Sequence, residues 1–259
     1  MLPEKDLMVF SPGRRDSTVI GTVEYCRKKG LELRKKYLNV SSFDIAGKRK
    51  ELEEILGTVE KPVLDSVYRF REINGWSRLA LKTSDYKLIP LLLKTPSAKT
   101  GEFVVFTHPE GKRAIPPELI DEAVKSGKGV VIVDLSGTGE ASSPSTGEDY
   151  AKGKLRIITL SEMWFGRTTL GEWVKELNTV TRFLISGYHA RDIILDGFRE
   201  TGLSGLYLGA AGAQVNEIVL RDAPVSYLIG SRETIDFYSM AVHLQGILEW
   251  GDISLAAAL

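Results

Sequence analysis

The sequence has little of what disulfide-bonded and metal-binding proteins require. Among its 259 residues only Cys26 is a cysteine, which excludes an internal disulfide and a thiolate metal cluster. The three histidines are scattered, without the H-x-H or H-x-x-x-H spacing of a zinc site. Gly137 and Gly139 are not followed by the Lys-Ser/Thr pair of a phosphate-binding loop. We therefore expect no metal and no cofactor.

Net charge and long apolar runs are also absent. Thirty-four basic and 34 acidic residues balance to a formal net charge of zero, which argues against a nucleic-acid partner. Apolar runs such as residues 89–93 and 129–133 are too short to cross a bilayer, so no membrane partner is expected. Residues 1–10 lack the basic and apolar regions of a signal peptide, and the localisation stays open.

The sequence changes character near residue 60. Residues 17–56 are rich in Lys, Arg and Glu with helically spaced apolar residues, and the second predicted helix, residues 43–56, ends at Gly57. Ser41 and Ser42 are candidate caps for that helix. We predict a helical arm or linker over residues 1–60 and an α/β domain over residues 61–259.

Three runs with alternating apolar residues follow Pro62. Residues 67–73, 77–83 and 87–94 are predicted strands, joined by turns at Asn74-Gly75 and Ser84-Asp85. They predict an antiparallel start to the sheet. Pro90 lies inside the third run, and because proline cannot donate a ladder hydrogen bond, it indicates an edge position or a bulge.

Beyond residue 100 strands and helices alternate, which is typical of a doubly wound, mainly parallel sheet. The predicted strands are residues 102–107, 129–134, 155–160, 192–195 and 216–220. The predicted helices are residues 116–125, 170–184 and 201–213, and the middle one carries a one-sided apolar stripe. The predicted fold class is therefore α/β.

Four stretches resemble parts of one family, and their order along the chain agrees with it. Residues 130–142 (VVIVDLSGTGEAS) resemble the D-x-x-G-x-G-x-S stretch of α/β-hydrolases of the acetyl xylan esterase and dienelactone hydrolase type, through Asp134, Gly137, Gly139 and Ser142. Residues 106–112 resemble the segment near the oxyanion hole, and residues 165–184 the helix before the nucleophile strand. Residues 246–259 are similar to the stretch that leads into the late strand supporting the acidic residue. The resemblance covers residues 65–259 and implies an α/β-hydrolase fold and carboxylic ester hydrolysis.

Residues 6–36 resemble the junction of two-part esterase-like proteins, in which a second hydrolase-like half follows the first. By this resemblance the chain is a second, degenerate half that lacks the last strands of the family. The expected partner is then a companion hydrolase half that acts on acylated carbohydrate, or a second copy in a homo-oligomer.

In this family a strand turns sharply into a helix and exposes a serine, within a G-x-S-x-G pattern. Here the pattern falls on residues 197–201, inside the segment 196–202 (DGFRETG) that we call the elbow. Arg199 holds the place of the serine, and Thr201 that of the second glycine. A guanidinium stays protonated and cannot attack a carbonyl. The elbow therefore predicts a domain without a catalytic nucleophile.

Other residues offer only part of a triad. Ser204, about one helical turn further on, is a rescue candidate for the nucleophile, and Asp222 is the nearest carboxylate. His108 lies near the oxyanion loop, His189 is expected to pack or cap before the nucleophile strand, and His243 is expected to be partly buried in a helix. A structural role is favoured over a catalytic one for each of the three. A carboxylate orients a catalytic imidazole only when both are present.

Three functions remain open. The first is a non-catalytic esterase-like domain that supports or binds a companion carbohydrate esterase. The second is an active serine esterase, with Ser204 or another serine as a non-standard nucleophile. In the third, Arg199 anchors an acidic ligand such as a uronic sugar, since a guanidinium at a helix N-terminus suits a carboxylate.

Overall fold

The computed structural model describes residues 3, 19–38, 42, 44–97, 100–142, 150–230 and 237–259. The chain divides into two compact units, residues 1–41 and 42–259. The first contains α2 (Thr22–Leu38), a charged and mainly exposed helix. The helix α3 (Ile45–Leu56) falls in the second unit, because Leu52 and Leu56 are buried in its core. The division thus comes before α3, whereas composition placed it near residue 60.

Both ends of α3 can be compared with the predicted capping residues. Its N-cap is Asp44 rather than Ser42, and Ser41 lies outside the described residues. Its C-cap is Gly57, as predicted, with a φ of 71° that favours glycine.

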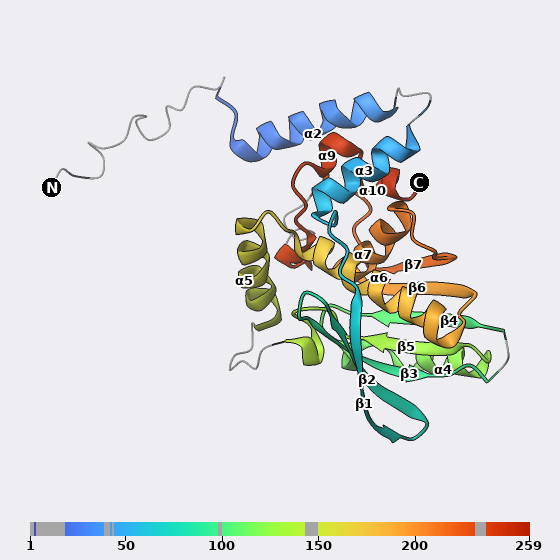
Figure 1. The fold of residues 1–259 in the computed structure, drawn as a ribbon. Helices are drawn as coiled ribbons and strands as arrows, with labels where there is room; N and C mark the ends of the chain where they lie inside the picture. The colour runs from blue at the N-terminus through green and yellow to red at the C-terminus, as the bar shows by residue number, and fades with distance from the viewer. Residues whose placement is uncertain are drawn as a thin grey trace. The chain divides into compact units, whose positions relative to one another are not determined.

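The second unit is built on a mixed sheet of seven described strands in the order β1-β2-β3-β5-β4-β6-β7 (Figure 1). The antiparallel strands are β1 (Leu64–Ile73), β2 (Trp76–Thr83) and β3 (Leu88–Lys94). The parallel strands are β4 (Glu102–Thr107), β5 (Gly129–Val133), β6 (Asp192–Phe198) and β7 (Glu217–Arg221). The predicted α/β class with antiparallel N-terminal strands is confirmed.

Helices cover the parallel strands on both faces. On one face α4 (Pro117–Lys125) contributes Ala123 to a core that contains Val104 and Ile132. On the other, α6 (Thr169–Tyr188) and α7 (Arg199–Ala210) pack on the neighbouring positions, such as Val105 and Val131. Adjacent residues serve opposite cores because side chains of a strand alternate between its faces. Because both faces of these strands are buried, their sequences are continuous runs of apolar residues.

Two predictions about strands were wrong. Residues 155–160 lie in a helix, α5 (Tyr150–Trp164), in which Leu155 and Thr159 are buried while Ile157 is exposed. This spacing of four follows the helical period, which prevails over the preference of Ile157 for strands. Pro90 is in an interior strand, since β3 pairs with β2 and with β5. There the Asp134 N–H donates to the Pro90 carbonyl at 3.0 Å, so the missing proline donor is tolerated where the β5 ladder ends.

The C-terminal residues form two short helices, α9 (Ile247–Trp250) and α10 (Asp252–Ala256). Trp250 is buried and its indole N–H donates to the Lys48 carbonyl of α3 at 2.8 Å. Arg49 donates to the Ala210 carbonyl at the end of α7. These contacts join α3 to the layer of α7. None of the helices in the described ranges is long and apolar enough to cross a membrane.

The D-x-x-G-x-G stretch ties together two loops at the ends of β4 and β5. Asp134 is 1% exposed and accepts hydrogen bonds from the backbone N–H groups of Lys112 at 2.7 Å and Glu140 at 2.8 Å. The Lys112 ammonium also binds this carboxylate. Gly139 and Gly111 are needed because a Cβ on Gly111 would lie 2.4 Å from the Gly139 Cα. The motif thus has a structural role in this chain.

We expect Asp134→Asn to lower the free energy of unfolding by about 3 kcal/mol, because it leaves the Lys112 ammonium without its buried partner. Urea denaturation measures the change. The control is Asp121→Asn on the exposed side of α4, which should change stability by less than about 0.5 kcal/mol. Equal effects of the two substitutions would contradict the role given to Asp134.

Candidate functional site

The elbow has the geometry of a nucleophile turn. Strand β6 ends at Phe198, and α7 begins at Arg199, whose φ is 48°. A non-glycine residue in the left-handed region is strained, and α/β-hydrolases place their nucleophile at such a turn between strand and helix. Arg199 therefore occupies the position from which a serine would be presented.

Two glycines allow β6 and α7 to approach closely. A Cβ on Gly202 would lie 2.6 Å from the Gly197 carbonyl oxygen, and a Cβ on Gly197 would lie 2.5 Å from the Gly202 Cα. Thr201, the departure from the family pattern, is buried and its hydroxyl donates to the Phe198 carbonyl at 2.7 Å. The close backbone contact is thus made by the residue after Thr201, and the elbow keeps its packing.

The Arg199 side chain lies among partners from three segments. Its guanidinium is 3.4 Å from the Glu110 carboxylate, donates to the Phe237 carbonyl and lies over the Phe237 ring, 4.7 Å from the centroid. Its Nε is 3.6 Å from Oε2 of Glu200, a carboxylate that is 0% exposed. The other Glu200 oxygen accepts the Ser239 backbone N–H. Arg199 and Glu200 together hold residues 237–239 over the elbow.

One pair of atoms in this arrangement lacks hydrogen bonds. Among the described residues, Arg199 Nε and Glu200 Oε2 are buried without a hydrogen-bond partner, and they face each other as an ion pair. Burying a charge is costly unless an opposite charge compensates it. The predicted anion site at Arg199 therefore already contains two carboxylates, Glu110 and Glu200.

Ser204 is placed away from any substrate. It lies inside α7 with 0% exposure, and its hydroxyl donates to the Thr201 carbonyl at 2.6 Å. A nucleophile must reach the substrate and have a base within hydrogen-bond distance. Ser204 has neither in the described residues.

The histidine nearest the elbow accepts a backbone hydrogen bond at Nδ1. The His108 ring lies 5.0 Å from the Phe198 ring, and its Nδ1 accepts the Glu110 backbone N–H at 3.0 Å. The proton of neutral His108 is therefore on Nε2, which cannot also accept one. Burial lowers the pKa of His108 and the Arg199 cation lowers it further, while the carboxylates of Glu110 and Asp222 raise it. His108 is a neutral side chain beside the elbow.

The remaining triad candidates lie apart. Asp222 follows β7 with a φ of 52°, and its backbone carbonyl accepts the Tyr238 hydroxyl at 3.1 Å. His189 is the exposed C-cap of α6, with a φ of 53°, as a capping role predicts. His243 is exposed after a 3-10 turn, so the prediction that it is partly buried in a helix was wrong. The structure does not bring a serine, histidine and carboxylate together in the described residues.

Open space lies elsewhere. The region under the elbow, between Leu177, Gly197 and Thr201, has no room for a water molecule. A hollow of about 510 Å³ lies on β2 and β3, lined by residues that include Phe70, Arg78 and Glu140. No group of three or more His, Cys, Asp or Glu within the described ranges could hold a metal ion.

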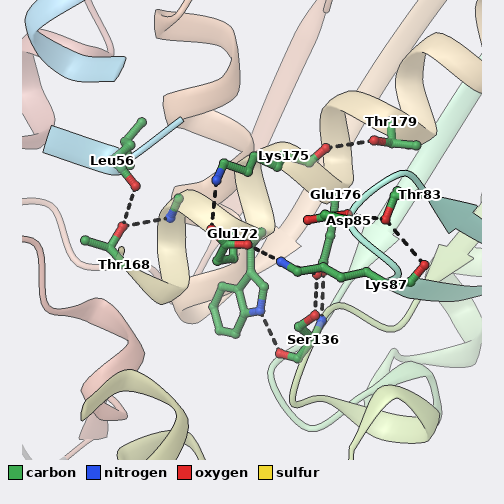
Figure 2. Close-up of polar contacts among 12 residues, drawn as sticks. Leu56, Thr83, Asp85, Lys87, Ser136, Thr168, Glu172, Lys175, Glu176 and Thr179 are labelled. Atoms are coloured by element: carbon green, nitrogen blue, oxygen red, sulfur yellow. Dashed lines mark hydrogen bonds and ion pairs between the residues drawn. The ribbon is translucent and has the colours of Figure 1, made fainter. Parts of the chain in front are cut away.

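A second polar cluster joins α6 to the sheet, and Figure 2 shows it. Lys87, at the β2–β3 turn, binds Glu172 and lies 3.6 Å from Glu176. Lys175 binds Glu172 at 2.9 Å. Glu176 accepts the Ser136 N–H at 2.8 Å, and the Trp173 indole donates to the Ser136 carbonyl at 2.8 Å. Buried charges from α6 thus fix the loop after β5.

The charges within this cluster are unequal. Burial raises the pKa of Glu176, and Lys87 only partly offsets this. Burial would also raise the pKa of Glu172, but Lys87 and Lys175 bring it below its usual value. Burial raises the pKa of Glu162 on α5, and the Glu172 charge raises it further. The two lysines therefore compensate the burial of the Glu172 carboxylate. Ionisation of Glu162 is less favourable, because its carboxyl is partly buried and near the negative charge of Glu172.

Sequence reasoning missed the residues that surround Arg199. Glu200 had a detectable signal, since it is a carboxylate next to an arginine at the start of a helix of small and apolar residues. Phe237 and Glu110 had none, because they reach Arg199 from 38 and 89 positions away. Lys87, Glu172 and Glu176 were missed for the same reason.

We expect Gly202→Ala to destabilise the chain by about 2 kcal/mol or more, because the new Cβ would meet the Gly197 backbone. Gly205→Ala, one turn further along α7, is the control. Its Cβ would lie 3.4 Å from Leu195, and alanine favours the helix by up to about 1 kcal/mol. Thermal denaturation distinguishes them, and a stable Gly202→Ala variant would refute the close contact.

We expect Glu162→Gln to raise the Tm by about 1–3 °C at pH 8 and to leave it nearly unchanged near pH 4. A carboxyl with a raised folded-state pKa costs stability above that pKa, and the cost vanishes below the unfolded-state pKa. Tm measured across this pH range is the test. A gain of the same size at both ends would show that ionisation of Glu162 is not its cause.

Comparison with known proteins supports the fold. No protein-family model and no curated protein matches the sequence. A candidate acetyl xylan esterase from Bacteroides fragilis has a similar structure, with a TM-score of 0.68 at 14% identity over 95% of this chain and 74% of that one. Acetyl xylan esterase 1 from Thermoanaerobacterium sp. JW/SL YS485 gives a TM-score of 0.50 at 12% identity, over 83% of this chain and 74% of its own. The chain has an α/β-hydrolase fold that resembles those of acetyl xylan esterases.

Proposed function

We propose that the chain is an esterase-like domain that no longer hydrolyses esters and that supports or binds a companion carbohydrate esterase. The observation that carries the proposal is Arg199 at the strained turn between β6 and α7, with a φ of 48°. In an α/β-hydrolase that turn presents the nucleophile. An arginine there has no atom able to form an acyl-enzyme.

The surroundings of Arg199 also support a non-catalytic role. An ester must enter a concave site to be hydrolysed, and the guanidinium at the elbow is instead bonded to the Phe237 carbonyl and stacked on its ring. The buried Glu200 holds Ser239 in the same segment. An oxyanion forming beside Glu200 would also meet an unfavourable negative charge.

The alternative, an active esterase with a non-standard nucleophile, has less support. Ser204 is the candidate that the sequence offers, and it is enclosed in α7 with its hydroxyl bonded to the Thr201 carbonyl. This alternative takes its histidine from a partner or from outside the given sequence, because His108, the histidine nearest the elbow, already binds a backbone N–H through its acceptor nitrogen. Both groups would have to rearrange before a proton could be transferred.

The supporting role rests on the retained fold. The elbow keeps a strained residue and a tight glycine contact, although no reactive atom benefits from either. A fold kept without its chemistry suits a domain that is needed for its shape. The companion enzyme and its acylated carbohydrate substrate are inferred from the similarity to acetyl xylan esterases, which is a similarity of fold.

The test is labelling with a fluorophosphonate probe, which modifies activated serines. We expect no labelling of the native chain above that of the heat-denatured chain, and no hydrolysis of p-nitrophenyl acetate above that of the Ser204→Ala variant. The physical reason is that the Ser204 hydroxyl donates to a backbone carbonyl and His108 Nδ1 accepts a backbone N–H, so neither is placed for serine activation.

Stoichiometric labelling would overturn the proposal. Its loss in Ser204→Ala would identify Ser204 as the nucleophile and establish the alternative. Persistence of the labelling in that variant would point to another serine.

A further inference from the structure

The hollow on β2 and β3 has an apolar floor. Ala80 and Pro90 lie opposite each other in the register of the two strands, and both line the hollow. Leu79 is buried in the main core, so its neighbour Ala80 and the paired Pro90 point to the other face of the sheet. Alanine has only a methyl side chain and fills little of the space above it. The floor therefore offers an apolar surface on which a ligand can lie.

The walls of the hollow come from larger side chains and a loop. Phe70 of β1 is 57% exposed and Leu88 of β3 is 52% exposed, and both line the hollow. Residues 140–142, in the loop after β5, line it as well. Small-molecule sites measure about 300–1,000 Å³ and combine an apolar or aromatic lining with a few polar groups. At about 510 Å³, the hollow has the size and the lining of such a site.

The charges around the hollow leave one cation without a partner. Arg78 lines the hollow and has no hydrogen-bond or ion-pair partner within the part of the chain that the structure describes. Glu140 lies 3.2 Å from the Lys112 ammonium and its side chain is 71% exposed, so the ammonium and water screen its charge. Lys82, two residues beyond Ala80 on β2, binds Asp65 at 2.9 Å. The charge that a ligand can compensate is therefore positive.

The register places this cation beside the apolar floor. Arg78 is two residues before Ala80 on β2, so the two side chains share a face of the sheet. Arg78 pairs with Phe70 on one side and with Leu92 on the other. Side chains paired in this way have their Cβ atoms about 4.5–5.5 Å apart. A ligand that lies on the floor can therefore reach the guanidinium with an acidic group.

We propose that the hollow binds a small aromatic carboxylate. Its carboxylate accepts two parallel hydrogen bonds from the Arg78 guanidinium, a geometry that suits this pair of groups. Its ring lies on Ala80 and Pro90 and packs beside the Phe70 ring, with the offset or edge contact that aromatic rings prefer. A single guanidinium matches the single charge of a carboxylate, whereas a phosphate monoester carries nearly two.

This site is separate from the elbow and does not depend on the proposed function. Strands β5 and β4 lie between β3 and β6, which carries the elbow. Two further strands in a sheet span about 10 Å. Arg78 and Arg199 are therefore different cations at different places on the domain, and a ligand at one can be distinguished from a ligand at the other.

Isothermal titration calorimetry with 2-naphthoate tests the proposal. We expect one molecule to bind per chain with a Kd of about 1 mM or lower, which is the strength expected of a ligand of this size. Uncharged 2-naphthamide should bind about tenfold more weakly, because it cannot form the charge-assisted pair with Arg78. A wild-type chain that shows no saturable binding of 2-naphthoate would overturn the proposal, as would equal affinity for the amide.

Three variants locate the binding. Arg78→Gln should weaken 2-naphthoate about tenfold by removing the charge, and Ala80→Phe should abolish binding by filling the hollow. The control is Arg69→Gln, which removes an exposed arginine on the opposite face of β1, where it pairs with Leu79. It should bind as the wild type does. Circular dichroism establishes that each variant is folded. Wild-type affinity in folded Arg78→Gln or Ala80→Phe would contradict the site, and so would an equal loss in Arg69→Gln.

Chemical modification identifies the arginine that the ligand contacts. Phenylglyoxal modifies accessible arginines, and peptide mass spectrometry follows each position separately. At about ten times its Kd, 2-naphthoate should slow the modification of Arg78 about tenfold, because only the unoccupied site reacts, and should leave Arg69 unaffected. Protection of Arg199 without protection of Arg78 would place the carboxylate at the elbow and refute the proposal.

Discussion

The close contact between the backbones of β6 and α7 is the constraint on which the rest of the domain depends. Gly197 and Gly202 allow the helix to begin directly at the end of the strand, and this leaves Arg199 with a left-handed φ. From there α7 runs beneath the sheet, with Leu203, Leu206 and Tyr207 buried in the main core. The turn is therefore a structural requirement of the fold.

The charged groups around this contact form two separate clusters, and each connects different parts of the chain. At the elbow, Arg199 and Glu200 fasten the segment 237–239 in place. Beyond it, Lys87, Glu172 and Glu176 connect a turn, a helix and a loop that are far apart in sequence. Each arrangement neutralises charge that burial would otherwise make costly. Together they join segments that are distant in sequence while keeping their buried charges paired.

Much of this fold could be predicted from the sequence because its signals are local. The apolar runs at β4 and β5, the stripe along α6 and the Asn74-Gly75 turn each follow from residues close together in the chain. The segment 155–160 misled because β-branched residues suggest a strand, while only the burial of Leu155 and Thr159 reveals the helical period. The position of Arg199 could be predicted as well, since a motif places it. Its partners could not, because Glu110 and Phe237 reach it through tertiary structure alone.

The buried Glu200 also limits how this domain can change. A single replacement of Arg199 by serine would introduce the residue type of an esterase nucleophile, but it would leave Glu200 without its ion pair inside the core. Removing one partner of a buried pair costs about 3–5 kcal/mol, a large share of the stability of an ordinary domain. A serine at position 199 is therefore compatible with this packed core only if Glu200 changes with it.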